Sequence, residues 1–384
     1  MPHFIAKDSA LKLPFSEGDF TFCEEFIDEK YPTQSLILTR YKNQVFFIKK
    51  TPRAHGILFK AEKNSRPSLT GILKDALSSL AKSHDLITHN LSHNTPKQMS
   101  KSPYLLDAHE VLGLRLEDFV LEIGFGSGRH LLDLARKNPQ TLFLGIEIHT
   151  PSIEQVLRQI ELLGLSNLYI TRLDARILAT ILPSNSCKQI YLHFPVPWNK
   201  KPHRRVLSPT FLTHAMRILA PQATLHLRTD DEEYFTDALA LALSTPRASF
   251  SVNKNLSQEI ISKYEARWLK QEKNIYDLHF KSLESSPALE LNHDFTLLYF
   301  PHTPAIPQKT LEKDFFIHLN ARFHAKNSII LNISFGDFNW PNTKFILINH
   351  QDQTTTFLGE PPLATPANIK AHQRLVHYIT SSGE

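Results

Sequence analysis

The hydrophobic pattern of the central part of the chain alternates between two kinds of segment. From about residue 105 to 285, short apolar runs typical of buried strands alternate with amphipathic segments typical of surface helices. The apolar runs predict strands at 119–123, 142–148, 168–173, 188–194, 223–229 and 276–281. The amphipathic segments predict helices at 129–138, 151–164, 208–220 and 231–244. Gly164 is placed to end the second of these helices. Alternation of this kind predicts an α/β fold with a mostly parallel, doubly wound sheet.

The N-terminal stretch has a different pattern. Short apolar runs at Leu36–Leu38 and Val45–Ile48 flank a Tyr-Lys-Asn-Gln turn and predict a β-hairpin. Residues 67–83 predict a helix. Residues 84–103 are rich in Ser, His, Asn and Thr and predict a linker.

The C-terminal stretch also predicts strands. Apolar and polar residues alternate from Phe315 to Phe323 and again from Leu331 to Phe335, which is typical of half-buried antiparallel strands. A final helix is predicted near 367–379. We therefore expect three domains: a β-rich N-terminal extension and linker (1–103), an α/β domain (104–285) and a β-rich C-terminal extension (286–384).

Composition narrows the class of protein. The chain has 384 residues, of which 41% are hydrophobic, enough for a globular core of two or three domains. It contains no run of about 18 apolar residues, and its first ten residues lack the apolar region of a signal peptide. Two isolated cysteines, Cys23 and Cys187, predict neither a disulfide framework nor a zinc site. We expect a cytoplasmic protein without a membrane segment or a bound metal.

Positive charge is concentrated in one segment. Between Arg40 and Lys101 there are twelve Lys and Arg but only three acidic residues, whereas the formal net charge of the whole chain is +5. Such a segment is a plausible contact for nucleic acid. A solvated, lysine-rich surface is the equally weighted alternative.

The run from Phe119 to His130 contains the most informative motif. A buried-strand pattern ends in Glu122, and three glycines follow at alternate positions: Gly124, Gly126 and Gly128. Between a strand and a helix, such glycines let the backbone approach a ligand closely and predict a nucleotide-type pocket. The NAD fingerprint requires glycine at position 129, where Arg129 stands. The spacing instead resembles S-adenosylmethionine (SAM) sites of class I methyltransferases, although an ordinary glycine turn is the simpler alternative.

Acidic residues end three consecutive predicted strands. Glu147 lies about twenty residues after the glycines, where an acid can accept from both ribose hydroxyls. Asp174 ends the third strand, where a carboxylate can accept from the adenine amino group. Glu122 lies beneath the glycine loop, close to where the methionine ammonium would bind. Each alone is more often a helix N-cap or a surface acid, but their joint occurrence favours a SAM pocket.

The end of the fourth predicted strand reads Phe194-Pro-Val-Pro-Trp198-Asn-Lys200 and continues to His203-Arg204-Arg205. Here the chain resembles the bacterial tRNA (guanine-N7-)-methyltransferases, in a long form with extensions at both ends. Their patterns F-P-D-P-W-x-K, E-I-G-F-G-x-G and G-I-E-x-H match at 194–200, 122–128 and 145–149. Two later motifs, T-D-x-x-x-Y and T-x-x-E, resemble Thr229-Asp230 with Tyr234, and Ser262 with Glu265. The resemblance covers about half of the chain.

The resemblance implies an activity and a set of site residues. The family methylates N7 of a guanine in the tRNA variable loop, at position 46, with SAM as cofactor and without an obligate protein partner. A monomer or homodimer is expected. The residues that it implies as SAM contacts are Glu122, Gly124, Gly126, Gly128, Glu147 and Asp174. The residues that it implies as substrate contacts are Lys200, Asp230, Ser262 and Glu265. His203, Arg204 and Arg205 form a basic patch that we expect to bind RNA phosphates, for which a solvated loop is the alternative.

The chain departs from the family in two respects. The basic cluster after Trp198 is shorter than usual, and one position of the proline motif differs. The Asp between the two prolines of the family motif is Val196 here. We expect Asp230 or Glu265 to supply the carboxylate that the reaction uses. Trp198 either stacks a base or closes the turn as a core residue. His193 is expected to be a packed strand residue rather than a catalytic base.

Three other functions stay open on the sequence alone. The chain could be a methyltransferase for another RNA base, or a SAM- and tRNA-binding protein without catalytic activity, which the loss of the Asp at Val196 would explain. An NAD oxidoreductase is disfavoured by Arg129. The turn after the fourth strand also lacks the polar residue that accepts a proton in exocyclic-amine methyltransferases, which agrees with a ring nitrogen as the methyl acceptor.

Overall fold

The protein folds into two compact units. The computed structural model describes residues 2–8, 11–65, 67, 70–91, 102–245, 247, 249–257, 273–302, 304–338 and 340–381. One unit, here called the α/β unit, is Lys101–Leu291. The other, the β unit, combines Met1–Ser100 with Asn292–Glu384. Each unit is described by itself.

The α/β unit is built on one eight-stranded sheet in the order β14-β15-β13-β12-β9-β10-β11-β8. The pairs β13–β15 and β15–β14 are antiparallel and the others are parallel. The strands are β8 (Leu105–Leu106), β9 (Phe119–Ile123), β10 (Phe143–Ile146), β11 (Leu168–Thr171), β12 (Cys187–His193), β13 (Leu219–Thr229), β14 (Ser249–Lys254) and β15 (Tyr276–Lys281). This confirms the predicted mostly parallel, doubly wound sheet.

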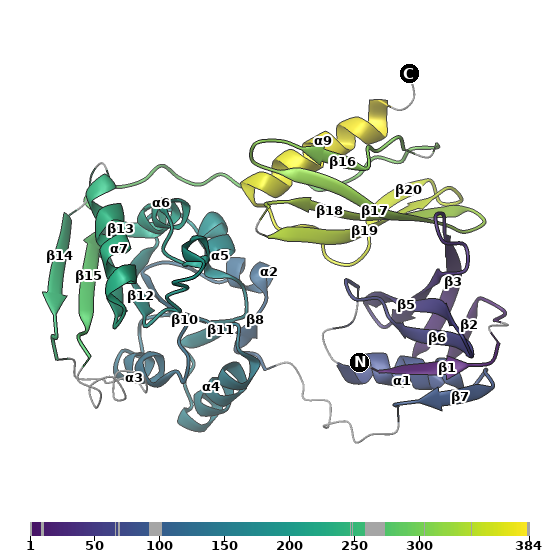
Figure 1. The fold of residues 1–384 in the computed structure, drawn as a ribbon, viewed down its shortest axis with the longest axis horizontal. Helices are drawn as coiled ribbons and strands as arrows, with labels where there is room; N and C mark the ends of the chain where they lie inside the picture. The colour runs from purple at the N-terminus through teal and green to yellow at the C-terminus, as the bar shows by residue number, and fades with distance from the viewer. Residues whose placement is uncertain are drawn as a thin grey trace. The chain divides into compact units, whose positions relative to one another are not determined.

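Helices cover both faces of this sheet. They are α2 (Ala108–Leu112), α3 (Arg129–Lys137), α4 (Thr150–Leu163), α5 (Ala175–Ile181), α6 (Pro209–Ile218) and α7 (Glu232–Ser244). Figure 1 shows α3 and α4 on one side of the sheet and α5 and α6 on the other. Leu131 and Val156, one from each of α3 and α4, are fully buried against Val120 of β9. Burial on both faces explains why these strands are nearly continuous apolar runs.

Element boundaries follow local chemistry. Gly164 ends α4 in the left-handed conformation (φ 63°), as predicted. β10 ends at Ile146, two residues before the predicted limit, because the Glu147 carboxylate accepts from the amides of Ile148 and His149 and turns the chain. The helices α2 and α5 and the edge strands β8 and β14 were not predicted.

The order of the sheet reverses between β9 and β12. From β9 the chain continues outward to β10 and β11, and then returns to the other side of β9 through β12 and β13. Ligands of open α/β sheets bind outside the carboxyl ends of the strands at such a switch point. The glycine loop after β9 and the loop after β12 both start there.

The β unit contains a twelve-stranded sheet with two short strands, β2 and β16, off its main path β20-β19-β18-β17-β3-β4-β5-β6-β1-β7. The strands from the N-terminal segment are β1 (His3–Ala6), β2 (Phe15–Glu17), β3 (Phe20–Asp28), β4 (Ser35–Tyr41), β5 (Gln44–Arg53), β6 (Gly56–Ala61) and β7 (Leu86–His89). Those from the C-terminal segment are β16 (Lys309–Leu311), β17 (Phe316–His324), β18 (Ser328–Gly336), β19 (Pro341–Asn349) and β20 (Thr354–Phe357). The predicted hairpin at β4 and β5 is confirmed.

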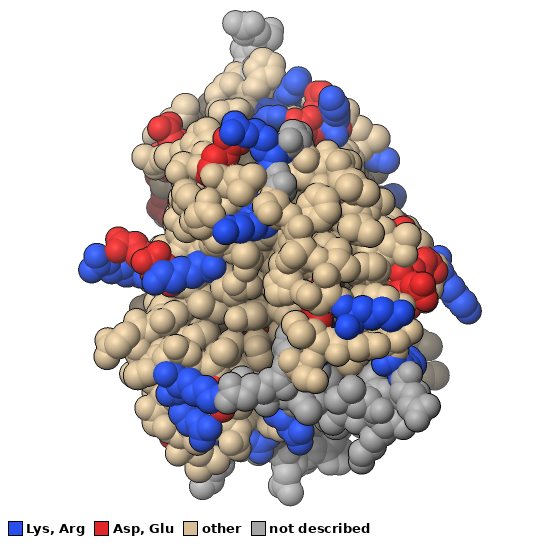
Figure 2. All heavy atoms as spheres, turned by 90° about the vertical axis from the view of Figure 1, so that its left-hand side faces the viewer, with Lys and Arg blue, Asp and Glu red and all other residues tan. Residues whose placement is uncertain are grey.

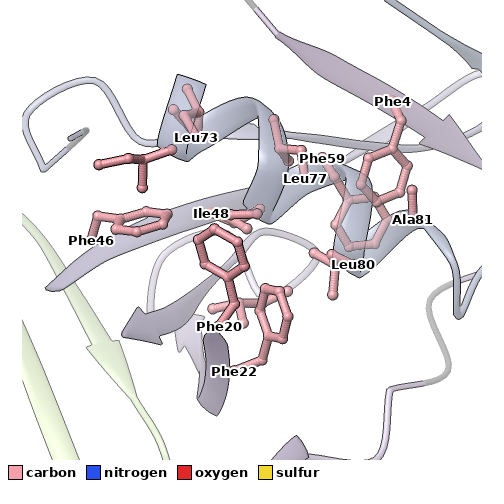
Figure 3. Close-up of a cluster of buried hydrophobic side chains, with 14 of the residues drawn as sticks. Phe4, Phe20, Phe22, Phe46, Ile48, Phe59, Leu73, Leu77, Leu80 and Ala81 are labelled. Carbon is pink, nitrogen blue, oxygen red and sulfur yellow. The ribbon is translucent and has the colours of Figure 1, made fainter. Parts of the chain in front are cut away.

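Two helices cover this sheet. Leu73, Leu77 and Leu80 of α1 (Thr70–Ala81) pack among aromatic side chains of the N-terminal strands, as Figure 3 shows. In the C-terminal half, Ala371, Leu375 and Ile379 of α9 (Pro366–Ser381) pack on β17, β18 and β19. Both helices agree with the predicted positions, 67–83 and 367–379.

The two halves of the β unit are joined by β3 and β17. Ile27 pairs with His324 and Asp28 with Phe323. A shared apolar cluster takes Phe26 and Phe47 from one half and Phe345 from the other. The sequence pattern did not indicate that the two extensions share a sheet. Of the helices described, none has the length and apolar character needed to cross a bilayer.

Candidate methyl-transfer site

The glycine loop after β9 has the backbone shape that a ligand pocket requires. All three of its glycines adopt positive φ: Gly124 (71°), Gly126 (54°) and Gly128 (70°). A Cβ built on Gly124 meets no atom within 4 Å, so this glycine borders open space. One built on Gly128 would lie 2.3 Å from Cγ2 of Val156, so Gly128 permits the close approach of α3 and α4. The loop thus combines an open side with a tightly packed side.

Glu122 lies directly beneath this loop and is almost completely buried, with 3% of its surface exposed. Its Oε2 accepts a hydrogen bond from Nδ1 of His130 at 2.8 Å. The imidazole of His130 is also buried, and it belongs to the first turn of α3. A buried carboxylate with one oxygen engaged by a neutral or charged imidazole is suited to receive a cationic group of a ligand.

Glu147 ties the end of β10 to the glycine loop. Its Oε2 accepts from the amide of Gly126 at 3.0 Å, and its Oε1 accepts from the amides of Ile148 and His149. The structure therefore brings the second predicted acid next to the loop. Three backbone donors hold the carboxylate in place. The two at Oε1 use both of its lone pairs, so Oε2 is the oxygen that retains a lone pair for a ribose hydroxyl.

Asp174 acts as the N-cap of α5. Its Oδ1 accepts from the amide of Arg176 at 2.8 Å, and the guanidinium of Arg176 contacts both carboxylate oxygens. Helix capping, the simpler alternative for this residue, is thus observed. Contact with an adenine amino group stays a prediction for Asp174.

These features fit a nucleoside cofactor with a cationic amino-acid tail. The open side of Gly124 leaves room for the ligand, Glu147 offers acceptors to hydroxyl groups, and Glu122 offers a negative charge. The three acids end adjacent strands of one sheet edge. The residues present therefore suit SAM better than an anionic dinucleotide, which would meet negative charge at Glu122.

The loop after β12 contains two bulky residues in left-handed backbone conformations. Phe194 has φ 49° and Trp198 has φ 48°. Such conformations are uncommon for large side chains and are typical of functional sites whose surroundings hold them in place. Between them, Val196 is 63% exposed and has no carboxylate to offer. Trp198 is 39% exposed, so it is not a core residue, and the guanidinium of Arg204 lies 5.2 Å from the centre of its ring.

Arg205 anchors this loop from within, which corrects its predicted role as a substrate contact. Only 3% of the residue is exposed. Its Nε donates to the carbonyl oxygen of Pro197 at 2.6 Å, and its Nη2 donates to Glu233 at 2.8 Å and to Asn199 at 3.3 Å. Its Nη1 also donates to Asp237. A guanidinium with this many partners is not available to a phosphate; it joins the loop to α7.

The other side chains of the loop differ in their surroundings. Lys200 and His203 are exposed, as is Arg204, so these three predicted substrate contacts are accessible. Nδ2 of Asn199 donates to Oδ2 of Asp231, which is the N-cap of α7. The loop is therefore attached to the carboxyl end of β13 while its cationic side chains face solvent.

Asp230 follows β13 and lies beside this attachment. Its Oδ2 accepts from Nζ of Lys273 at 2.9 Å, and its side chain is mostly buried. The predicted carboxylate thus forms an ion pair in the structure. The other two predicted substrate residues, Ser262 and Glu265, lie outside the described residues.

A buried polar cluster next to the site was not predicted. Asp277 accepts from Nη1 of Arg228 through both carboxylate oxygens, at 2.6 and 2.7 Å, and Oδ1 also contacts Nε2 of His226 at 2.7 Å. Ligand atoms of His226, Asp277 and His279 lie within 4.8 Å of one another. However, the guanidinium of Arg228 already occupies the carboxylate that a metal would need. One sequence signal could have indicated this cluster. Polar residues stand at alternate positions of two otherwise mostly apolar strands, β13 and β15.

Figure 2 shows all described residues from the left-hand side of Figure 1, where the edge strand β14 of the α/β unit lies. On this face the described Lys and Arg side chains form small separate groups, several with acidic neighbours, around a broad uncharged area. Exposed apolar residues of this edge include Phe250 and Val252. The picture gives no support to a continuous basic field at this edge.

Comparisons with known proteins agree with the fold and the site. Residues 117–278 match a family described as "Putative methyltransferase". The tRNA (guanine-N(7)-)-methyltransferase of Helicobacter hepaticus is 44% identical over 99% of this chain and all of its own length. The proteins of the same name from Wolinella succinogenes and Campylobacter jejuni are each 36% identical, over 99% and 98% of this chain and 100% and 97% of their own lengths.

These relatives extend the likeness well beyond the motifs of the α/β unit. The matched length includes both segments of the β unit as well as the α/β unit of this chain. The chain belongs to the family of tRNA (guanine-N7-)-methyltransferases.

Proposed function

We propose that this protein transfers a methyl group from SAM to N7 of a guanine in tRNA, at position 46 of the variable loop. The observation that supports this most directly is the juxtaposition of a methyl-donor pocket with an acceptor loop. Glu122, the glycine loop and Glu147 form the pocket at the end of β9 and β10, and the loop from Phe194 to Arg205 begins at the adjacent strand β12. The names of the relatives support tRNA as the substrate.

The residues of the acceptor loop fit a ring nitrogen as the methyl acceptor. Guanine N7 has an in-plane lone pair and no proton, so no base has to remove a proton during the transfer. When bound, SAM supplies an electrophilic methyl group. The side chains of Phe194, Pro195, Val196 and Pro197 offer no proton acceptor, and this chemistry requires none. Position and alignment of the two reactants can lower the barrier by about 7–11 kcal/mol.

Exposed groups of the loop suit an RNA substrate. Trp198 presents a half-open ring with Arg204 beside it, and a base stacked on such a ring gains about 1–3 kcal/mol. Lys200 and His203 lie in the same exposed loop and can contact phosphates. Val196 then contributes an apolar surface at the position where the family pattern F-P-D-P-W-x-K has Asp.

Asp230 supplies the negative charge that offsets the positive charge of the methylated base. We predict that Asp230→Asn lowers kcat about a hundredfold to a thousandfold and leaves SAM affinity unchanged, because removal of one preorganised electrostatic contact has an effect of this order. Single-turnover methyl transfer to tRNA measures the rate, and calorimetry measures the affinity.

The matched control is Lys273→Met, which frees Asp230 from its ion pair. If Asp230 acts on the base, this variant keeps or gains activity. Equal losses in both variants would instead mean that Asp230 only positions Lys273.

The decisive experiment is methyl transfer from labelled SAM to unmodified tRNA, with the product nucleoside and its position identified. We expect N7-methylguanosine at position 46. Transfer to another base would support the methyltransferase activity and contradict guanine N7 at position 46 as the acceptor. Binding of SAM and tRNA without transfer would favour a non-catalytic binding protein, the alternative that exposed Val196 suggests.

A further inference from the structure

A polar stripe crosses the sheet of the α/β unit next to the glycine loop. In the strand register Glu122 of β9 is opposite Tyr191 of β12, and Tyr191 is opposite His226 of β13. His193 lies two residues after Tyr191 and therefore on the same face of the sheet. The neighbouring positions on the other face, such as Leu192 and Leu227, are fully buried apolar residues. The stripe is a feature of one face, and of its members the chemistry described above uses only Glu122.

Hydrogen bonds connect this stripe into a chain. Oδ1 of Asp277 contacts Nε2 of His226 at 2.7 Å, and Nδ1 of His226 contacts Nε2 of His193 at 3.1 Å. His193 is the last residue of β12 and is half-buried. The chain thus begins deep in the sheet and ends at the edge where the acceptor loop starts.

The charges of the cluster determine which nitrogens carry protons. Arg228 is permanently charged and donates to both oxygens of Asp277, so the pair is already neutral. A second buried cation at His226 would have no counter-charge. Burial, together with the neighbouring His226 and His130, also holds the pKa of His193 well below its usual value. His193 is therefore neutral, and His226 lacks the counter-charge that a cation there would need.

Neutral imidazoles leave only one arrangement of protons along the chain. Nε2–H of His226 donates to Asp277, so Nδ1 of His226 is an acceptor. Nε2–H of His193 donates to that acceptor, so Nδ1 of His193 carries a lone pair. No described residue donates a hydrogen bond to Nδ1 of His193, and this atom is not fully buried. His193 therefore presents a fixed acceptor to the space at the sheet edge.

That space is the amino-acid end of the predicted methyl-donor pocket. The ring of His193 lies 4.8 Å from the ring of His130, and His130 donates to Glu122. Leu192 pairs with Ile123, so His193 ends β12 at the level where the glycine loop leaves β9. A carboxylate and a neutral nitrogen acceptor thus occupy one wall of the pocket.

We infer that Nδ1 of His193 accepts a hydrogen bond from the α-ammonium group of bound SAM, beside the carboxylate of Glu122. An ammonium has three N–H donors, so it can bind the carboxylate and the imidazole nitrogen together. Asp277 and His226 act as positioning residues that keep the proton on Nε2 of His193. This inference rests on the proposed methyl-donor site.

The test compares two thioether ligands that differ only in the amino-acid tail. S-adenosylhomocysteine has the ammonium, and 5′-methylthioadenosine lacks the whole tail. Calorimetry on the full-length protein measures both affinities in the wild type, His193→Leu and His193→Gln. We expect His193→Leu to bind S-adenosylhomocysteine about tenfold more weakly and 5′-methylthioadenosine equally well, because hydrogen bonds to charged groups have effects of this size. In His193→Gln an amide can donate to His226 and accept from the ammonium, so most of the affinity should return.

The controls separate local from general effects. His214→Leu removes a half-buried histidine of α6 outside the site and should change neither affinity. Equal weakening of both ligands by His193→Leu, or no weakening of either, would overturn the inference and leave the methyl-donor site intact. Failure of the wild-type protein to bind S-adenosylhomocysteine would overturn the methyl-donor site, and the inference with it.

Discussion

Arg205 shows how a single buried side chain shapes the acceptor loop. It lies in a run of basic residues that read as a phosphate-binding patch, yet its guanidinium donates to the loop itself and to α7. Its neighbour Arg204 is exposed beside Trp198. Two adjacent arginines therefore have different roles: Arg204 ends the η1 turn (Pro202–Arg204) and is exposed, whereas Arg205 follows the turn and is buried.

We predict that Arg205→Lys lowers kcat/KM for tRNA about tenfold and leaves S-adenosylhomocysteine affinity unchanged. A lysine cannot reproduce the forked set of donors that reach Pro197, Asn199 and Glu233 together. Loss of one or two such hydrogen bonds should also lower the free energy of unfolding by about 1–3 kcal/mol. Steady-state kinetics and urea denaturation give the two values.

Arg204→Lys is the control, because that side chain is exposed. It should leave the free energy of unfolding unchanged and affect only tRNA binding. If Arg205→Lys and Arg204→Lys behave alike in both measurements, the anchoring role of Arg205 is wrong.

The final helix of the β unit contains a histidine whose surroundings make it sensitive to acid. His372 of α9 is buried, and Nε2 of His293 lies 2.9 Å from its Nδ1. Burial, and then the proximity of His293, lower the pKa of His372 to about 4. In the unfolded chain the same group titrates at about 6.5.

The sign of the effect follows from proton uptake. Between pH 6.5 and 4 the unfolded chain binds a proton at His372 and the folded protein does not, so the free energy of unfolding falls as the pH is lowered through this window. The slope for one group is at most about 1.4 kcal/mol per pH unit, and the effect is absent above pH 6.5. We predict that His372→Leu reduces this loss, measured as the difference in urea midpoint between variant and wild type at pH 7.5, 6 and 5.

His377→Leu, on the exposed side of the same helix, provides the comparison and should show the pH dependence of the wild type. A His372→Leu protein with the same pH dependence as the wild type would contradict the assignment.

At the scale of the whole molecule, the β unit depends on both ends of the chain. His324 and Glu29, which are 295 residues apart, lie 3.2 Å from each other at the join of β17 and β3. Part of the positive charge of the N-terminal segment is also neutralised within the unit, since Lys50 contacts Glu25 at 2.8 Å and Lys82 contacts Glu17 at 2.5 Å. Removal of residues 1–100 alone would therefore expose the apolar cluster that Phe26 and Phe47 share with Phe345.

We predict that a chain of residues 101–291 folds and binds S-adenosylhomocysteine like the full protein, because the α/β unit has its own sheet and core. If the β unit holds tRNA, this fragment should show a higher KM for tRNA and a shallower dependence of binding on salt. The full-length protein and a chain lacking only residues 1–100 are the comparisons, and the latter should aggregate. Unchanged tRNA kinetics in the fragment would mean that the β unit has no part in binding tRNA.

The sequence by itself determined those features that depend on local contacts. Strand–helix alternation predicted the sheet of the α/β unit, and the spacing of Gly124, Gly126 and Gly128 predicted the pocket, since both depend on backbone preferences within about thirty residues. Helix ends such as Gly164 followed from the same preferences.

Only the tertiary structure decided the features that depend on distant residues. It joined β3 to β17, turned Arg205 inward and connected His193 to Asp277 through His226. Each of these depends on which side chains meet across strands and loops far apart along the chain. The types and spacing of residues do not specify these contacts, because burial and hydrogen-bond partners are determined only when the sheet has assembled.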